Sequence, residues 1–134
     1  MSAEPILDLS EAAKGLVDLL GAEVVEASAD HAVVCLDVGP QHLQPHGVLH
    51  GGVHCTLVET AASVGAYMWL GAAVVGVNNN TDFLRPVTEG RLTATASPIQ
   101  RGRTQQLWLV EITNDAGKLV ARGQVRLHNV GARA

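Results

Sequence analysis

The spacing of apolar positions changes along the chain, and the changes predict two helices and six strands. Residues 53–70 contain no proline, and larger apolar residues recur there at three- to seven-residue steps with small residues between them. That pattern predicts a long, buried helix. A shorter amphipathic run over 11–20, ended by Gly21, predicts an N-terminal helix. The predicted strands cover residues 22–28, 31–38, 74–85, 91–100, 104–113 and 118–129.

Turn signals between these strands indicate antiparallel pairing. Arg101-Gly102-Arg103 forms one tight turn, and Asn114-Asp115-Ala116-Gly117 is a strong hairpin signal. In the last strand alternate residues from Leu119 to Leu127 are apolar or small, so one face of the sheet is dry. The order of elements therefore predicts an α+β fold, in which an antiparallel sheet of five to six strands wraps around the long helix.

The size of the chain fits one domain, and its composition favours assembly. We expect a single domain over residues 1–134, with residues 1–9 poorly ordered. Hydrophobic residues make up 47% of the sequence and charged residues 16%. This apolar balance suggests that a partner subunit covers part of the surface, so we expect a homo-oligomer.

Charge and cysteine content indicate which ligands the protein can bind and in which cell compartment it is expected. A net charge of −4 argues against nucleic-acid binding, which needs a basic surface. No Lys or Arg occurs between Lys14 and Arg85, so any polyphosphate ligand must be held by the later part of the chain. Two cysteines without a hydrophobic leader predict a cytoplasmic protein. Glycines interrupt the longest apolar stretch, 61–77, so no membrane segment is expected.

The most informative stretch joins a loop to the start of the long helix. Gln44 to Gly52 is rich in proline and glycine, and Gly51 and Gly52 let backbone approach a ligand closely. A helix start offers unpaired N–H groups and a partial positive charge, and Glu59 lies two turns further on. This combination suggests acyl-transfer chemistry. The plainer interpretation makes Glu59 a solvated residue on an exposed helix face.

Four histidines at four-residue intervals resemble a metal ladder. They are His42, His46, His50 and His54. The proline and glycines between them prevent one continuous helix, so the four rings cannot share a face, and no metal site is expected. We interpret His42, His46 and His54 as loop or surface residues.

Taken together, these features resemble the hotdog-fold acyl-CoA thioesterases of the phenylacetate-pathway thioesterase superfamily. The likeness spans nearly the whole chain and is closer to the branch of 4-hydroxybenzoyl-CoA and 1,4-dihydroxy-2-naphthoyl-CoA thioesterases. The phenylacetate type itself carries Asp in place of Glu59 and Asn in place of Gln44. The residues that carry the likeness are Gln44, His50-Gly51-Gly52, Glu59, Ser63, Asn78-Asn79-Asn80, Phe83-Leu84-Arg85-Pro86, Glu89-Gly90 and the run from Arg101 to Trp108.

The resemblance implies a role for each of five residues. The backbone N–H of Gly51 would polarise the thioester carbonyl, and Glu59 would act as nucleophile or general base. Gln44 would orient the thioester or the attacking water, supported by His50. Ser63, one turn beyond Glu59, would position water or substrate. No metal or other cofactor is implied, because coenzyme A is part of the substrate.

The resemblance also implies a homotetramer, a dimer of dimers, with the active site between subunits. Gln44, His50 and Gly51 of one chain would face Glu59 and Ser63 of another. Two plainer interpretations compete with a role in substrate binding. In one, Asn78-Asn79-Asn80 is an exposed polar edge strand, and in the other, Arg85, Arg101 and Arg103 only add solubilising charge. The candidate substrate- and coenzyme A-binding residues are Asn80, Phe83, Arg85, Arg101, Gly102, Arg103 and Thr104.

The sequence thus predicts an acyl-CoA thioesterase that releases free acid and coenzyme A. An aryl-CoA, such as 1,4-dihydroxy-2-naphthoyl-CoA or a hydroxybenzoyl-CoA, is the expected substrate, and Ser63 leans toward the dihydroxynaphthoyl type. One alternative is a broad-specificity thioesterase for medium-chain or misloaded acyl groups. A second alternative, of another class, is a non-catalytic acyl-CoA-binding module. Such a module would not need Glu59.

Overall fold

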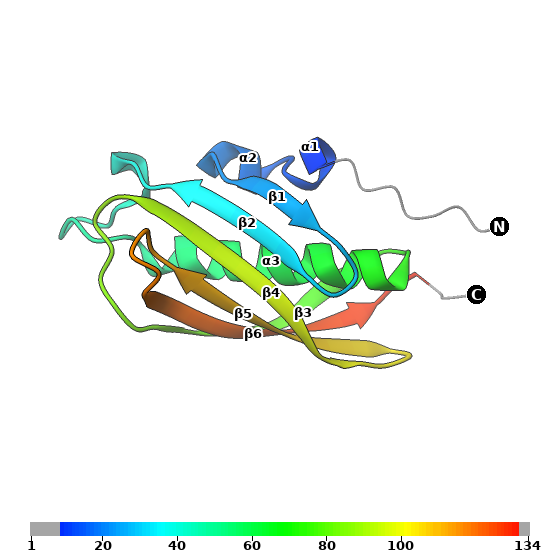
Figure 1. Ribbon diagram of the computed structural model, residues 1–134. Coiled ribbons are helices and arrows are strands. Elements are labelled where there is room, and N and C mark those ends of the chain that lie inside the picture. Colours follow the sequence, from blue (N-terminus) through cyan, green and yellow to red (C-terminus); the bar gives the residue numbers. More distant parts are fainter. Residues whose placement is uncertain (1–8, 132–134) are drawn as a thin grey trace.

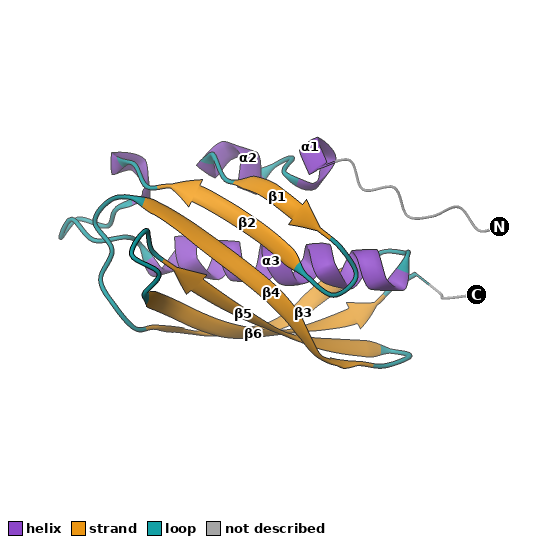
Figure 2. Cartoon of the chain, in the orientation of Figure 1, coloured by secondary structure: helices purple, strands orange, loops and turns teal. Residues whose placement is uncertain are grey.

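A six-stranded antiparallel sheet curves around one long helix, as the sequence predicts (Figures 1 and 2). The computed structural model describes residues 9–131. The sheet order is β1-β2-β4-β5-β6-β3, so β1 and β3 form its edges. The helices are α1 (Leu9–Ala12), α2 (Leu16–Leu20), the 3-10 turn η1 (Pro40–His42) and α3 (Gly51–Leu70). The strands are β1 (Glu23–Ala27), β2 (Ala32–Asp37), β3 (Val74–Phe83), β4 (Arg91–Arg101), β5 (Gln105–Thr113) and β6 (Leu119–Asn129).

Helix α3 is closed at both ends by residues that the sequence places there. At its start, the ring of His50 accepts a hydrogen bond from the Gly52 N–H at 2.8 Å. At its end, Gly71 takes the left-handed conformation with φ of 74°. Small residues let the sheet approach closely, and Gly65 lies directly against the Trp108 ring. The helix therefore fills the concave face of the sheet.

Gln106 and Trp108, two of the residues that carry the family likeness, hold the structure together. The Gln106 side chain is fully buried, and its Nε2 donates to the Ala66 carbonyl at 3.2 Å and to Asn129 Oδ1 at 2.9 Å. The indole N–H of Trp108 donates to Gln106 Oε1 at 2.8 Å. These bonds satisfy buried polar groups and hold the C-terminal half of α3 to the sheet.

The edge strand β3 combines a bulge with exposed apolar side chains. Among the described strands it pairs only with β6, and the register shifts between Gly76 and Asn78. Val75 and Val77 are 49% and 55% exposed. Strand β3 thus presents an open backbone edge beside apolar surface, a combination that usually needs a cover.

The N-terminal helix is the element that the sequence predicted wrongly. Instead of one helix over 11–20 there are two short ones beside β1, separated by Gly15 with φ of 83°. A positive φ interrupts a right-handed helix. Leu9 begins α1, and the rest of the segment expected to be poorly ordered lies outside the described residues.

Two of the histidines interpreted as loop or surface residues are buried, so that interpretation was wrong for them. His42 and His54 are each 2% exposed, whereas His46 is exposed. His42 Nδ1 accepts from the Gly39 N–H at 2.9 Å, and its Nε2 donates to the Leu20 carbonyl at 2.7 Å. His42 therefore ties the loop to the end of α2.

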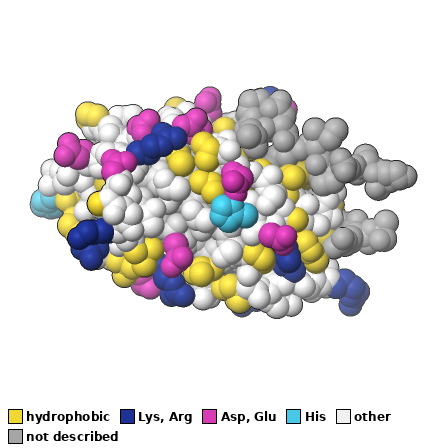
Figure 3. Space-filling view, viewed as in Figure 1, with side chains coloured by type: hydrophobic (Ala, Val, Ile, Leu, Met, Phe, Trp, Pro, Cys, Tyr) yellow, Lys and Arg dark blue, Asp and Glu magenta, His cyan; other side chains and the backbone are white. Residues whose placement is uncertain are grey.

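Charged side chains of both signs are interspersed on the face shown in Figure 3. Residues 9–131 contain no group of three or more His, Cys, Asp or Glu able to hold a metal ion. None of the helices in the same part of the chain is long and apolar enough to cross a membrane.

Candidate active site

The first half of the site is a cavity of about 330 Å³ at the start of α3, here called the helix-start cavity. Its wall includes Gln44, Gly51, His54, Phe83 and Arg85. Three separate segments meet there: the loop after η1, the first turn of α3, and the end of β3 with the residues that follow it. The sheet thus brings together residues that lie far apart in the sequence.

Hydrogen bonds in the loop define how Gln44 is presented. Its backbone N–H donates to the Val48 carbonyl at 2.8 Å, and its carbonyl accepts from the Gly47 N–H at 2.9 Å. Gly47 has φ of 86°, which allows this tight turn. The side-chain Oε1 accepts from the His46 N–H at 2.7 Å. The Nε2 of Gln44 is therefore the part of the amide that can donate to a ligand.

The first turn of α3 leaves the backbone N–H of Gly51 available as a donor. His50 accepts from the Gly52 N–H through its ring and from the Val53 N–H, at 2.9 Å, through its carbonyl. Within residues 9–131, the N–H of Gly51 donates to no other group. An unpaired N–H at the start of a 20-residue helix is suited to stabilising negative charge on an oxygen.

Phe83 lies across this first turn. A Cβ on Gly51 would overlap the Phe83 ring, so a larger residue at that position would have to displace the ring. The ring also stacks on His54, with centroids 5.5 Å apart and planes at 22°. Phe83 remains 55% exposed. Arg85, which is exposed, follows it at the rim and also lines a shallow neighbouring cavity with Lys118.

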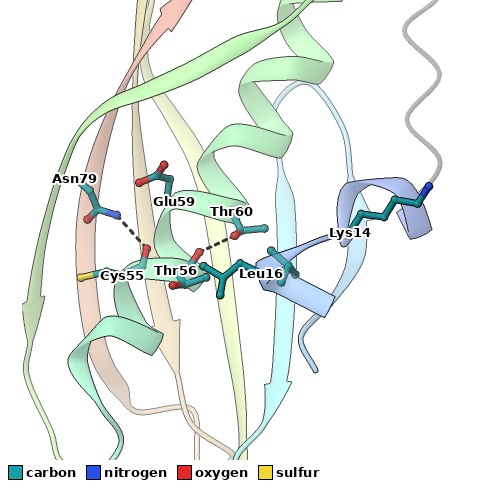
Figure 4. Close-up of a pocket in the computed structure, with 8 residues that line it drawn as sticks. Lys14, Leu16, Cys55, Thr56, Glu59, Thr60 and Asn79 are labelled. Atoms are coloured by element: carbon teal, nitrogen blue, oxygen red, sulfur yellow. Dashed lines mark hydrogen bonds between the residues drawn. The ribbon is translucent and has the colours of Figure 1, made fainter. Parts of the chain in front are cut away.

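The second half of the site surrounds Glu59, in the middle of α3. Glu59 lines two cavities, of about 410 and 400 Å³, beside α2 and β3. Figure 4 shows its carboxylate projecting from α3 toward β3, where Asn79 lies. Glu59 takes part in none of the ion pairs found among residues 9–131, and in the single chain its side chain is exposed.

Ser63 shares a cavity with Glu59, as their spacing on α3 predicts. The other cavity is shared by Asn79, and not by its neighbour Asn80, which the sequence predicts as a substrate-binding residue. Asn79 Nδ2 donates to the Cys55 carbonyl at 3.0 Å, whereas Asn80 is exposed. The bulge in β3 alters the alternation of side chains, and a bulge leaves no clear signal in a single sequence.

Within one chain, the two halves of the site do not meet. Gly51 and Glu59 are eight residues apart on the same helix, which corresponds to about 12 Å along its axis. Of the cavities just described, none is lined by both residues. A single thioester would not reach both groups of the same chain.

The predicted Arg101–Thr104 turn lies toward the opposite end of α3. Arg101 donates to Asp30 Oδ1 at 2.8 Å and to the Ala29 carbonyl at 2.7 Å, and its guanidinium lies over the Trp69 ring at 5.3 Å. The Gly102 N–H donates to the Gln105 carbonyl, the Thr104 carbonyl accepts from the Asn129 N–H, and Arg103 is exposed. In one chain these four residues are thus separate from the helix-start cavity, and their contact with coenzyme A remains a prediction.

The fold and these cavities define a class of protein, and comparisons with known proteins agree on it. Residues 46–121 match the Thioesterase superfamily. Rv1847 of Mycobacterium tuberculosis is 53% identical over 119 residues, which cover 85% of each chain. Its solved structure has a TM-score of 0.84, covering 87% of this chain and 97% of that one. The chain belongs to the thioesterase superfamily and is a thioester hydrolase with the hotdog fold.

Two further relatives carry more specific names. The 1,4-dihydroxy-2-naphthoyl-CoA hydrolase of Listeria monocytogenes is 39% identical over 108 residues, which are 79% of this chain and 88% of that protein. The structure of thioesterase HI1161 from Haemophilus influenzae has a TM-score of 0.88 at 33% identity, covering 96% of this chain and 94% of that one. The family and fold expected from the sequence are thereby confirmed.

Proposed function

We propose that the protein hydrolyses acyl-CoA thioesters to a free acid and coenzyme A. The observation that carries the proposal is the unpaired Gly51 N–H in the cavity that Gln44 also lines. This N–H would stabilise the oxyanion formed from the thioester carbonyl, and donors of this kind are worth roughly 100- to 1000-fold in rate. The Gln44 amide would orient the thioester or the attacking water.

Glu59 supplies the other half of the reaction. Its carboxylate either attacks the carbonyl carbon, displacing the coenzyme A thiolate and leaving an anhydride for water to cleave, or removes a proton from the attacking water. Ser63, in the same cavity, would position that water. Thiolate is a good leaving group, so a carboxylate with an oxyanion donor suffices, and no cofactor is required.

The complete site would form between two chains of a homotetramer. The distance of about 12 Å along α3 between Gly51 and Glu59 favours this arrangement. The open edge of β3, with exposed Val75 and Val77, offers a surface for pairing with a second copy. Glu59 lies next to this edge strand, so pairing along it would bring a partner's helix start toward the carboxylate.

An aryl-CoA is the substrate class that we favour, and 1,4-dihydroxy-2-naphthoyl-CoA or a hydroxybenzoyl-CoA is the first choice. The Listeria relative, named for a naphthoyl-CoA, and the exposed ring of Phe83 beside Gly51 support this choice. The Arg85 side chain at the rim would meet the phosphates of coenzyme A. Two free cysteines, Cys35 and Cys55, are in keeping with a cytoplasmic location.

The test is release of free coenzyme A thiol from a panel of aryl- and aliphatic-CoA thioesters. The native protein is compared with Glu59→Ala and with Glu111→Ala, which removes an exposed carboxylate on β5. We expect turnover of an aryl-CoA that is lost in Glu59→Ala and kept in Glu111→Ala. Equal turnover of aliphatic substrates would favour the broad-specificity alternative. Binding without turnover in the native protein would contradict hydrolysis and favour the non-catalytic module.

A further inference from the structure

His54 is a buried polar residue without a polar partner. Its Nδ1 is the one fully buried side-chain nitrogen or oxygen in residues 9–131 that makes no hydrogen bond. The other buried histidine, His42, has both ring nitrogens paired. Leaving such an atom unpaired costs stability, so the position is poorly explained by packing alone. A phenylalanine or leucine would fill the same space without that cost.

The ring lies in the wall of a cavity. Nδ1 is fully enclosed, whereas Nε2 is neither fully buried nor hydrogen-bonded to any of residues 9–131, so Nε2 is the nitrogen that a ligand in the cavity can reach. His54 lines the helix-start cavity together with Gln44 and Gly51, and one face of its ring is covered by Phe83. Burial lowers the pKa of His54 to about 4, so the imidazole is neutral near pH 7. A neutral imidazole has one nitrogen that donates and one that accepts, which matches a hydroxyl group.

We propose that His54 is a specificity-determining residue that hydrogen-bonds a hydroxyl substituent of a flat acyl group in the helix-start cavity. The inference rests on the proposed hydrolysis of acyl-CoA and names the part of the acyl group that is read. The two stacked rings provide a flat apolar wall, and His54 Nε2 provides the polar contact. An acyl group without the hydroxyl leaves that nitrogen unpaired and is therefore disfavoured.

The experiment compares benzoyl-CoA with its 2-, 3- and 4-hydroxy derivatives. For the native protein, we expect at least one hydroxylated substrate to exceed benzoyl-CoA by about tenfold or more in kcat/KM. His54→Phe keeps a ring against Phe83 but removes both nitrogens, so the ratio should fall toward one. His54→Gln carries a polar atom close to the Nε2 position and should keep part of the preference. His128→Phe, on the exposed face of β6, is the matched control and should keep the native ratio.

The readouts separate this inference from the proposed function. An unchanged ratio in folded His54→Phe would overturn the role of His54 and leave hydrolysis intact. If the native protein cleaves none of the four thioesters, hydrolysis of these aryl-CoAs fails, and their dissociation constants, measured by calorimetry, carry the same ratio test for His54. If His54→Phe does not fold, the comparison of His54→Leu with His54→Gln decides. A ratio near one in His54→Leu and a partly retained ratio in His54→Gln support the role, and the native ratio in both variants overturns it. Equal loss of all four substrates would indicate a structural role only and overturn the inference.

Discussion

The carboxylate of Glu59 lies against the α-carbon of Gly76, where a Cβ would come 2.8 Å from Oε2. Gly76 is at the bulge of β3, so the strand leaves space there because its side chain is a hydrogen and its register shifts. The position of the proposed catalytic carboxylate therefore depends on a residue with no chemical group of its own.

Replacing Gly76 by Ala should lower activity by displacing Glu59. A Cβ at this position must push the carboxylate away, and a displacement of about 1 Å can cost about 100-fold in rate. We expect kcat to fall by about 10- to 100-fold, with a smaller change in KM, since Gly76 lies away from the helix-start cavity. Steady-state kinetics on the preferred acyl-CoA measures both.

A double-mutant cycle shows whether the effect acts through Glu59. In Glu59→Asp the side chain is one methylene shorter and withdraws from Gly76, so adding Gly76→Ala should then cost much less than it does alone. If the two losses in kcat simply multiply, Gly76 does not act by positioning the carboxylate. Thermal unfolding of each variant checks that the bulge itself survives.

Mixing two inactive variants should restore activity if the site forms between chains. Gln44→Ala and Glu59→Ala each damage a different half, and a mixed dimer keeps one intact site composed of a native half from each chain. Co-refolding equal amounts should recover roughly one quarter of native activity, because about half of the dimers are mixed and each has one working site. No recovery in a co-refolded sample shown to exchange subunits would place the whole site within one chain.

The buried ring of His54 should make the free energy of unfolding depend on pH. Its pKa is lowered from 6.5 to about 4 by burial, so between these values the unfolded chain binds the proton more readily than the folded one. This contribution is fully present above pH 6.5 and is lost as the pH falls toward 4. The difference is on the order of 3 kcal/mol.

Urea unfolding of the native protein and of His54→Phe, at pH values from 7 to 4, isolates that contribution. The native protein should lose more stability than His54→Phe over this range. Parallel pH profiles for the two proteins would show that His54 titrates near its ordinary pKa when folded.

Gln106 should matter for stability, in contrast to its neighbour Gln105. Gln106→Leu removes the partner of the Trp108 indole N–H and of two acceptors, Asn129 Oδ1 and the Ala66 carbonyl. Unpaired buried groups cost about 1–3 kcal/mol each, so we expect a loss of at least that size. Gln105→Leu, at an exposed position, should change stability by about 0.5 kcal/mol or less. Chemical denaturation measures both, and equal effects would contradict a structural role for the network.

The elements whose signals are local were predictable from the sequence. An uninterrupted run with small residues and a terminal Gly71 is sufficient to indicate α3, and the Asn114–Gly117 turn indicates the last hairpin. The joint occurrence of Gln44, the Gly51 helix start and Glu59 was also readable, because each belongs to one contiguous stretch. The family and fold followed from these features.

Other features depend on what packs against a residue, and only the tertiary structure decided them. His42 and His54 look polar in the sequence, but the end of α2 pairs with one ring and Phe83 covers the other. The bulge turned Asn79, and not Asn80, toward α3 and left space at Gly76 for Glu59.

The separation of the two halves of the site was expected from the family resemblance, but the spacing of the residues along the chain did not indicate it. Gly51 and Glu59 look close in the chain, yet a helix rises by about 1.5 Å per residue and keeps them on different cavities. Local patterns thus determined which elements form and which residue types they carry. Packing of β3 against α3 decided where those residues lie, because bulges, burial and cavity walls arise from contacts between segments that are distant in sequence.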